Sequence, residues 1–363
     1  MRGSPEAFML RAIELARRGI GFVSPNPPVG CVLVKDNQIV AEGWHASLGA
    51  LHAEQMAIAE AEKRGIDTTL CDAYITLEPC HHHGRTPPCT EILLWAGIKR
   101  IFVAHPDPNP TVRGGGSLYL RNNGTKVIEN ILQDKAAKII SDFLFWCRYR
   151  RPLVTVKLAV DENDSVDDQS NISYRFTTEK SLELSHKLRS KMDAILVGSE
   201  TILRDDSELT VRFDNQCSQP LRVIIDPRRK SSSFNKVWND KAPTLRIVDT
   251  KTIDKSYNEV MIRKNNSSMI DPLAILQYLG DLEIQHILIE GGPKTIATFL
   301  DSDLIDRSII IRSKISHQKP FVVTQLLSTL QDIGQECYQF KIDSDLWTVN
   351  QRHPMDIINI SKK

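Results

Sequence analysis

The sequence predicts an α/β protein built from two domains. The chain has 363 residues, more than one hydrophobic core usually supports. In both halves, segments with helical apolar spacing alternate with short apolar strands. A basic run that ends in a proline, Cys147-Arg148-Tyr149-Arg150-Arg151-Pro152, separates the halves. We therefore expect one domain over residues 1–149 and a second over 150–363.

The first half predicts a helix, a pair of strands and then a strand-helix-strand unit. The opening helix covers about 5–18, the strands 29–35 and 38–44, and a long amphipathic helix 52–64. Strands at 73–77 and 100–103 flank a helix over 90–96, which Gly97 ends. Because a crossover helix joins the strands, we expect one sheet covered on both faces.

The second half repeats this alternation. We expect a strand over 153–159, a helix over 179–190 and strands over 194–197, 222–225 and 286–290. The last strand runs into Gly291-Gly292-Pro293 and a further helix. Residues 231–264 are polar, and their pattern assigns no element there.

Composition excludes several classes of protein. A formal net charge of +1 argues against a protein whose main function is to bind nucleic acid. No stretch approaches the eighteen or so apolar residues of a membrane span, and the amino terminus lacks a secretion signal. Seven scattered cysteines argue against a disulfide framework. We expect a cytoplasmic protein whose partners include neither nucleic acid nor a membrane.

A zinc-binding motif lies in the first half. His52 and Glu54 open the long helix, Cys80 follows a strand, and Cys89 comes nine residues later. Catalytic zinc takes three such ligands and leaves a fourth position for water. Residues two apart share a cavity only at the first turn of a helix, where His52 and Glu54 lie. A helix start beside Cys80 would also lower the pKa of its thiol.

The motif predicts hydrolytic deamination. Zinc lowers the pKa of a bound water to about 7, and Glu54 would carry its proton to the departing amine. Nucleobase deaminases use this H-x-E and P-C pairing, although their two cysteines lie three residues apart. A structural zinc site, with its fourth ligand from His81, His82 or His83, is the alternative, as are core cysteines beside an unrelated histidine. Since Glu54 has no purpose in a structural site, we favour catalysis.

Longer motifs resemble the bifunctional deaminase/reductase family of riboflavin biosynthesis, over nearly the whole chain. The motifs of the first half are Pro25-Asn26-Pro27-Pro28-Val29-Gly30-Cys31, Tyr74-Ile75-Thr76-Leu77-Glu78-Pro79-Cys80, His82-His83-Gly84-Arg85-Thr86-Pro87-Pro88-Cys89 and Asp107-Pro108-Asn109-Pro110. Those of the second half include Lys157-Leu158-Ala159, His186-Lys187-Leu188-Arg189, Leu209-Thr210-Val211-Arg212 and Glu290-Gly291-Gly292-Pro293.

The resemblance implies a cytidine-deaminase-like α/β/α domain in the first half. Its substrate would be 2,5-diamino-6-ribosylamino-4(3H)-pyrimidinone 5′-phosphate, a small phosphorylated pyrimidine. The implied substrate contacts are Asn26, His45, His82 and Arg85, with Arg85 facing the phosphate. An arginine offers a planar fork of donors to phosphate. Asn26, between prolines, is also a residue typical of a plain turn.

For the second half the resemblance implies a dihydrofolate-reductase-like α/β domain, which uses NADPH to reduce the ribosyl group to ribityl. The implied substrate residues are Ser173, Arg189, Leu209, Arg212 and Glu290. The implied cofactor residues are Ala159, Arg175, Thr201, Asp205 and Gly292. Taken singly, Arg189 and Arg212 are equally typical of solvated charges, and Gly-Gly-Pro of a loop. We also expect a homo-oligomer.

Three departures from the family pattern leave an alternative open. Carboxylates fill Val160-Asp161-Glu162-Asn163-Asp164-Ser165, where the family has a Ser-Leu-Asp-Gly-like turn. Arg175 replaces a tryptophan, and Pro227 replaces a serine. The alternative is an active deaminase with a degenerate, non-reducing second domain. A nucleic-acid deaminase and a non-catalytic zinc scaffold are the remaining rivals.

Overall fold

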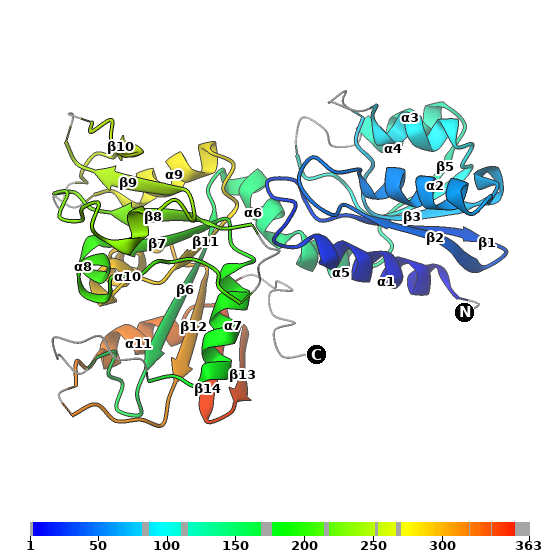
Figure 1. The fold of residues 1–363 in the computed structure, drawn as a ribbon. Coiled ribbons are helices and arrows are strands. Elements are labelled where there is room, and N and C mark those ends of the chain that lie inside the picture. The colour runs from blue at the N-terminus through cyan, green and yellow to red at the C-terminus, as the bar shows by residue number, and fades with distance from the viewer. Residues whose placement is uncertain are drawn as a thin grey trace. The chain divides into compact units, whose positions relative to one another are not determined.

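The chain folds into two compact units. The computed structural model describes residues 3–81, 87–109, 115–167, 176–213, 218–250, 253–265, 270–318, 320–334 and 336–352. One unit covers residues up to Tyr149, and the other begins at Arg150 (Figure 1). Among the described helices, none has the length and apolarity that a membrane crossing needs.

The first unit is a five-stranded mixed sheet with helices. Its helices are α1 (Pro5–Ala16), α2 (Ala53–Lys63), α3 (Cys89–Trp95), α4 (Gly115–Asn122), α5 (Gln133–Ile139) and α6 (Ser141–Tyr149). Its strands are β1 (Gly30–Lys35), β2 (Gln38–Trp44), β3 (Asp72–Leu77), β4 (Arg100–His105) and β5 (Lys126–Ile128). The strand order is β2-β1-β3-β4-β5. Strands β3, β4 and β5 run parallel, while β1 pairs antiparallel with β2 and β3.

Both faces of this sheet are buried, as the sequence predicts. Alternate residues of β1 serve opposite cores: Cys31 and Leu33 pack with α2 and α3, whereas Val32 and Val34 pack with α1 and α5. This follows from the period of two in a strand. Figure 1 shows α1 and α5 on one side of the sheet and α2, α3 and α4 on the other.

Two glycines let helices approach the sheet closely. A Cβ atom on Gly30 would lie 2.0 Å from the Ala12 carbonyl oxygen of α1. A Cβ atom on Gly43, one strand away, would lie 2.2 Å from the Ala53 carbonyl oxygen of α2. Real side chains do not tolerate these distances. Gly43 therefore sets how deeply the first turn of α2, which carries Glu54, sits against the sheet.

The second unit is built on a nine-stranded sheet. Its helices are α7 (Glu179–Arg189), α8 (Ser199–Asp205), α9 (Pro272–Asp281), α10 (Pro293–Asp301) and α11 (Thr324–Gln331). Its strands are β6 (Leu153–Val160), β7 (Ala194–Gly198), β8 (Leu221–Ile225), β9 (Thr244–Val248), β10 (Glu259–Met261), β11 (His286–Ile289), β12 (Arg307–Arg312), β13 (Glu336–Ile342) and β14 (Asp345–Gln351).

The strand order is β10-β9-β8-β7-β11-β6-β12-β14-β13. The first seven strands of this order are parallel to one another. Strand β14 pairs antiparallel with β12, and β13 pairs antiparallel with β14. Helices again cover both faces. Ala194 and Leu196 of β7 face the core formed with α9, α10 and α11, whereas Ile195 and Val197 face α7 and α8. The carboxyl ends of the parallel strands consequently share one edge, where ligands of such sheets bind.

The expected elements are confirmed, and several others had no clear signal. The strands at 38–44 and the helix over 179–190 agree with β2 and α7 to within a residue. In the unassigned stretch 231–264 the structure has β9, β10 and a short 3-10 helix, Lys236–Trp238. The apolar period of β9 is hidden because Arg246 is buried in it, with 1% of its surface exposed.

We predict that Gly43→Ala costs the first unit about 2 kcal/mol or more of unfolding free energy, because the new methyl group overpacks backbone of α2. Chemical denaturation measures this. Gly115→Ala is the control, since a Cβ atom there meets nothing within 4 Å, and its effect should stay within about 0.5 kcal/mol. Equal destabilisation by both variants would contradict the close approach of α2 to β2.

Candidate active sites

The amino end of α2 positions an imidazole and a carboxylate together. His52 is the N-cap of α2, and its backbone N–H donates to the Gln55 side chain at 2.9 Å. Glu54 lies in the first turn and is only 3% exposed. Because the chain is still entering the helix at His52, the two side chains lie close enough for their charges to interact, as the sequence predicts.

The two cysteines arrive from different elements. Cys80 lies three residues beyond β3, and Cys89 is the first residue of α3. The backbone N–H of Cys89 donates to the Cys80 sulfur at 3.4 Å. The sequence suggested that a helix begins directly after Cys80. Instead, the nearby helix is α3, which begins at Cys89, and the fold brings its first N–H group to the Cys80 sulfur. Such an N–H favours a thiolate.

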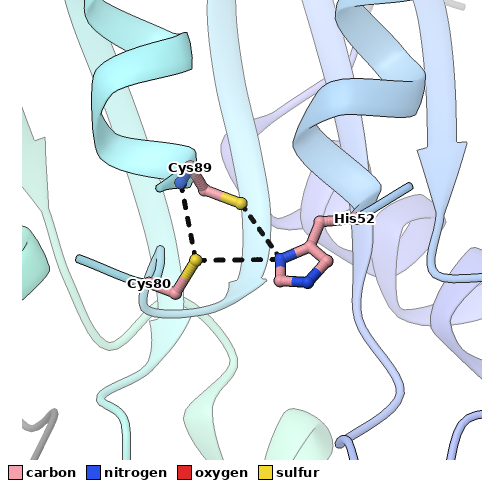
Figure 2. Close-up of side chains that lie close together, drawn as sticks. All are labelled: His52, Cys80 and Cys89. Atoms are coloured by element: carbon pink, nitrogen blue, oxygen red, sulfur yellow. Dashed lines mark hydrogen bonds between the residues drawn. The ribbon is translucent and has the colours of Figure 1, made fainter. Parts of the chain in front are cut away.

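His52, Cys80 and Cys89 converge on one point (Figure 2). The His52 Nδ1 atom lies 3.2 Å from the Cys89 sulfur and 3.7 Å from the Cys80 sulfur, and all three atoms lie within 4.8 Å of one another. Tetrahedral zinc with bonds of about 2.0–2.3 Å separates its ligands by similar distances. The donor set and its spacing therefore fit zinc, with three protein ligands.

Protonation within the cluster also fits a cation site. The hydrogen bond from the Cys89 thiol is the main cause that lowers the pKa of Cys80 to about 4, and the same bond raises the pKa of Cys89. A bound divalent cation would favour the thiolate form of both sulfurs. Burial, followed by the charge of Cys80, raises the pKa of Glu54.

His81 does not complete a closed structural site. Its Nδ1 atom bonds the Thr90 hydroxyl at 2.9 Å, and its ring stacks on Tyr119 of α4 at 4.0 Å between centroids. In the described part of the chain, the group able to hold a metal here comprises only His52, Cys80 and Cys89. The structure thus gives His81 a packing role. His82 and His83 lie outside the described residues.

A buried carboxylate organises the segment that carries Cys80. Glu78 directly follows β3, is 3% exposed, and accepts hydrogen bonds from the backbone N–H groups of Asp107 at 3.1 Å and Ser117 at 2.9 Å. It ties β3 to the chain after β4 and to α4. Sequence reasoning missed this role, although a glutamate that ends an apolar strand is a usable signal of a buried, partnered charge.

Two of the implied substrate residues lie beside the cluster. His45 is buried, and its ring centroid lies 5.3 Å from that of His52. Its Nδ1–H donates to the Leu51 carbonyl at 3.1 Å, which leaves Nε2 to accept from the Asn26 amide at 3.3 Å. Burial lowers the pKa of His45, so the neutral form is favoured. The Asn26 backbone also closes a turn onto Val23, so the turn interpretation of Asn26 is confirmed, and its substrate contact stays a prediction.

A second polar cluster lies at the carboxyl ends of β6 and β11. Glu290 follows β11, and its carboxylate accepts from Arg189 of α7, at 3.0 and 3.1 Å from Nε, and pairs with Lys157 of β6 at 3.3 Å. The alternative of a solvated charge is wrong for Arg189, which also donates to the Thr210 carbonyl. Lys157 was not among the implied site residues, although a lysine inside an apolar strand signals a partner.

Electrostatics keep the Glu290 cluster charged. Burial alone would raise the pKa of Glu290, but the charges of Arg189 and Lys157 outweigh it and hold the pKa at about 2. Next to this cluster, burial and the charges of Arg189 and Arg212 lower the pKa of His186 to about 4. His186 is therefore neutral at pH 7, and its Nε2 accepts from the Arg212 guanidinium at 3.1 Å.

The remaining implied residues of this unit separate into two groups. The Gly292 N–H donates to the Thr201 hydroxyl at 3.3 Å, so these two meet at the amino end of α10. No side chain caps that end, and its backbone N–H groups can face a phosphate. Ala159 is the last residue but one of β6, whereas Asp205 is exposed at the end of α8. Leu209 is buried among apolar side chains, so only its backbone can meet a ligand.

The carboxylates of the unusual turn after β6 are engaged within the protein. Asp161 accepts from the backbone N–H groups of Asn163 and Ser165 and pairs with His317. Asp164 pairs with Arg312 at 2.6 Å and has a φ of 62°, the conformation that a glycine would adopt in this turn. Asp161 thus shapes the turn through hydrogen bonds, and the charge of Asp164 is matched by Arg312.

Four of the implied site residues, His82, Arg85, Ser173 and Arg175, lie outside the described residues.

Family comparisons match both units. A model described as the cytidine and deoxycytidylate deaminase zinc-binding region matches residues 3–105, and one described as the RibD C-terminal domain matches residues 157–315. Riboflavin biosynthesis protein RibD of Aquifex aeolicus is 37% identical over 310 residues, 84% of this chain and 85% of that protein. The protein of the same name from Buchnera aphidicola is 35% identical over 369 residues, 95% and 98% of the two chains.

Solved structures agree over nearly the whole length. The diaminohydroxyphosphoribosylaminopyrimidine deaminase/5-amino-6-(5-phosphoribosylamino)uracil reductase of Thermotoga maritima has a TM-score of 0.83 at 33% identity. RibD of Acinetobacter baumannii has the same TM-score at 30% identity. Each match covers 96% of this chain and 98% of the other. The predicted two-part α/β fold and the resemblance are confirmed, and the chain belongs to the RibD family of riboflavin biosynthesis proteins.

Proposed function

We propose that this chain catalyses two successive steps of riboflavin biosynthesis. It deaminates 2,5-diamino-6-ribosylamino-4(3H)-pyrimidinone 5′-phosphate by hydrolysis and then reduces the ribosyl group to ribityl with NADPH. The convergence of His52, Cys80 and Cys89 beside buried Glu54 carries the first half of the proposal. The deaminase and reductase named for the Thermotoga maritima structure support both halves.

In the deaminase unit, His52, Cys80 and Cys89 hold zinc, which when bound supplies Lewis-acid activation of water at neutral pH. Glu54 accepts the proton of the attacking water and delivers it to the departing amino group. Its raised pKa and its contact with Cys89 favour this transfer. The Asn26 amide oxygen stays available for the pyrimidine, because its amide nitrogen already faces His45.

Substrate phosphate and ring contacts complete the deaminase site. Asn26, His45, His82 and Arg85 are the residues that we assign to the substrate. Two of them, Asn26 and His45, bond each other next to His52, which supports the assignment. A planar guanidinium such as that of Arg85 suits the 5′-phosphate.

In the reductase unit, NADPH supplies a hydride, and the chain binds and orients the sugar phosphate. We assign Ser173, Arg189, Leu209, Arg212 and Glu290 to the substrate and Ala159, Arg175, Thr201, Asp205 and Gly292 to the cofactor. Lys157 joins Arg189 on Glu290, so three partly buried charges meet beside the end of β11. The contact between Gly292 and Thr201 supports the cofactor assignment.

The structure gives no reason to prefer the degenerate second domain, since the carboxylates at 161–164 have partners within the protein. We place the protein in a reducing cytosol. The six cysteines that the structure describes are free thiols, which supports this location. The homo-oligomer stays a prediction.

We predict that Glu54→Gln lowers kcat for deamination by about 10²–10⁴-fold, the usual contribution of a general acid–base group, and leaves the zinc content unchanged. Mass spectrometry of products from the diaminopyrimidinone phosphate, with and without NADPH, measures both steps. Glu62→Gln, an exposed change on the same helix, is the matched control. If the Glu54→Gln variant deaminates the substrate at the native rate, Glu54 is not the proton carrier, and another residue carries the proton.

We predict that the stability supplied by Glu290 is complete above pH 4.5 and is lost as pH falls toward 2, because folding lowers its pKa. The shift corresponds to about 3 kcal/mol, of which roughly 1 kcal/mol is lost between pH 7 and 3.5. The unfolding free energy of the native protein minus that of Glu290→Gln should shrink accordingly on acidification. A difference that does not vary with pH would contradict the ion cluster.

A further inference from the structure

The second unit has an open pocket of about 510 Å³ near the amino ends of two of its strands. Thr244, the first residue of β9, and Asn258, directly before β10, both line it. Glu290 and Gly292 instead follow the carboxyl end of β11, which runs parallel to β9 and β10 within the sheet. The pocket is therefore separate from the proposed reductase site.

Two aromatic rings line this pocket and are held in place by a buried arginine. The rings of Trp238 and Tyr257 meet edge to face, with their centroids 4.6 Å apart. The guanidinium carbon of Arg246 lies 4.4 Å from the Trp238 centroid and 4.1 Å from the Tyr257 centroid. Arg246 in turn donates to the Ser231 carbonyl at 2.8 Å and to the Glu259 carboxylate at 3.0 Å. The rings are thus fixed before a ligand arrives, which lowers the entropy cost of binding.

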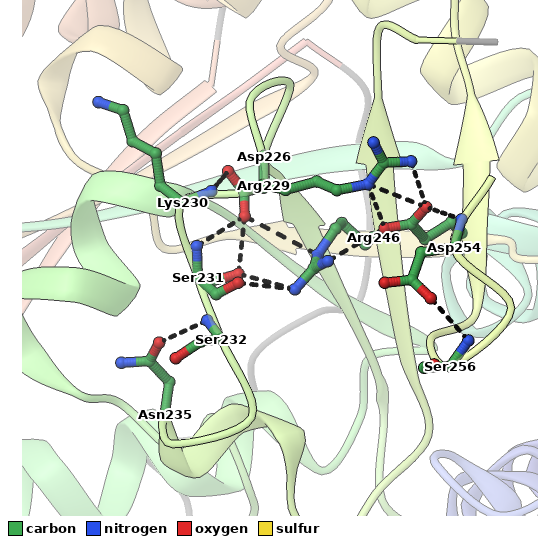
Figure 3. Close-up of polar contacts among 10 residues, drawn as sticks. Asp226, Arg229, Lys230, Ser231, Ser232, Asn235, Arg246, Asp254 and Ser256 are labelled. Carbon is green, nitrogen blue, oxygen red and sulfur yellow. Dashed lines mark hydrogen bonds and ion pairs between the residues drawn. The ribbon is translucent and has the colours of Figure 1, made fainter. Parts of the chain in front are cut away.

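Hydrogen bonds also fix the segment that carries Tyr257 (Figure 3). The Glu259 carboxylate accepts from the Asp254 N–H at 2.8 Å. The Asp254 carboxylate accepts from the Ser256 N–H at 2.9 Å, and the Asp254 carbonyl accepts from the Tyr257 N–H at 3.2 Å. The segment before β10 is therefore tied to the same glutamate that holds Arg246.

A turn beside the pocket presents an exposed aromatic ring. The Ser232 N–H donates to the Asn235 side chain at 3.0 Å, and the Asn235 N–H donates back to the Ser232 carbonyl at 2.9 Å. Ser233 lies within this turn and lines the pocket. Phe234 follows it and is 95% exposed, the most of any large apolar side chain among the described residues. Phe234 can therefore cover an occupant of the pocket without leaving a packed core.

The lining of the pocket is polar but uncharged. Among the described residues that line it, none is acidic or basic. The Ser256 hydroxyl and the Asn258 amide make no hydrogen bond with a described residue, so both are available to a ligand. Aromatic side chains stack flat heterocyclic rings, and hydroxyl and amide groups bond ring edges and sugar hydroxyls. This combination favours an uncharged ligand that has both a ring and hydroxyl groups.

We propose that this pocket binds an uncharged nucleoside-like compound, a flat heteroaromatic ring that carries hydroxyl groups. The ring lies against Trp238 and Tyr257 beneath Phe234, and the polar groups of the ligand bond to Ser256 and Asn258. Adenosine and riboflavin share this chemistry, the first as a nucleoside and the second as the compound for which the family is named. The inference goes beyond the proposed function and does not depend on it.

The direct test is titration calorimetry of the full chain with adenosine and with riboflavin, in the presence of excess NADPH. We expect at least one of the two to bind, and the one that binds identifies the source of the ligand. Ribitol, which has hydroxyl groups but no ring, should not bind. NADPH should not displace the ligand, because the proposed cofactor site lies at the opposite ends of the strands.

Two variants place the ligand in this pocket. Phe234→Ala should weaken binding by about three- to tenfold, because one aromatic contact is lost, and should leave the thermal midpoint unchanged, because the side chain is exposed. The double variant Ser256→Ala/Asn258→Ala should weaken binding by at least about threefold through the loss of hydrogen bonds. Leu282→Ala, which removes an apolar side chain that is 48% exposed elsewhere on the unit, is the matched control and should leave binding unchanged.

Either of two results would overturn the inference. If neither adenosine nor riboflavin binds in the presence of NADPH, the pocket holds only solvent. If one of them binds, but Phe234→Ala and the double variant bind it as tightly as the native chain does, the ligand lies elsewhere. Neither result bears on deamination or NADPH oxidation, so a failure of this inference is distinguishable from a failure of the proposed function.

Discussion

The meeting of one imidazole and two sulfurs is the constraint on which the first unit depends. His52 caps α2, Cys89 opens α3, and Cys80 follows β3. Two helix starts and one strand end must therefore bring their three ligand atoms within 4.8 Å of one another. The close contact of α2 with Gly43 holds one side of this arrangement. The Glu78 carboxylate holds the other. The sheet and its helices thus place three metal-binding donors beside the buried carboxyl group of Glu54.

In the second unit the equivalent constraint is the shared carboxyl edge of parallel strands. Glu290 follows β11, and Lys157 lies near the end of β6, so strand pairing alone brings their charges to 3.3 Å. Arg189 reaches them from α7. One row of strand ends therefore carries the charged cluster of this unit.

Local patterns in the sequence predicted most of the fold and the metal site, because both depend on residues that lie close together in the sequence. The alternation of apolar residues located β1, β2 and α7, and the spacing of His52 and Glu54 required a helix start. Contacts between distant residues could not be predicted in this way. Lys157 and Glu290 are 133 positions apart in the sequence, and His317, one partner of Asp161, is 156 residues away from it.

The central claim is that an ion held by this unit has three protein ligands. X-ray absorption at the zinc edge of the purified, active protein tests it most directly. We predict one zinc per chain with one imidazole nitrogen and two sulfurs as its protein ligands. Active protein without zinc, or a shell of four protein ligands, would contradict it.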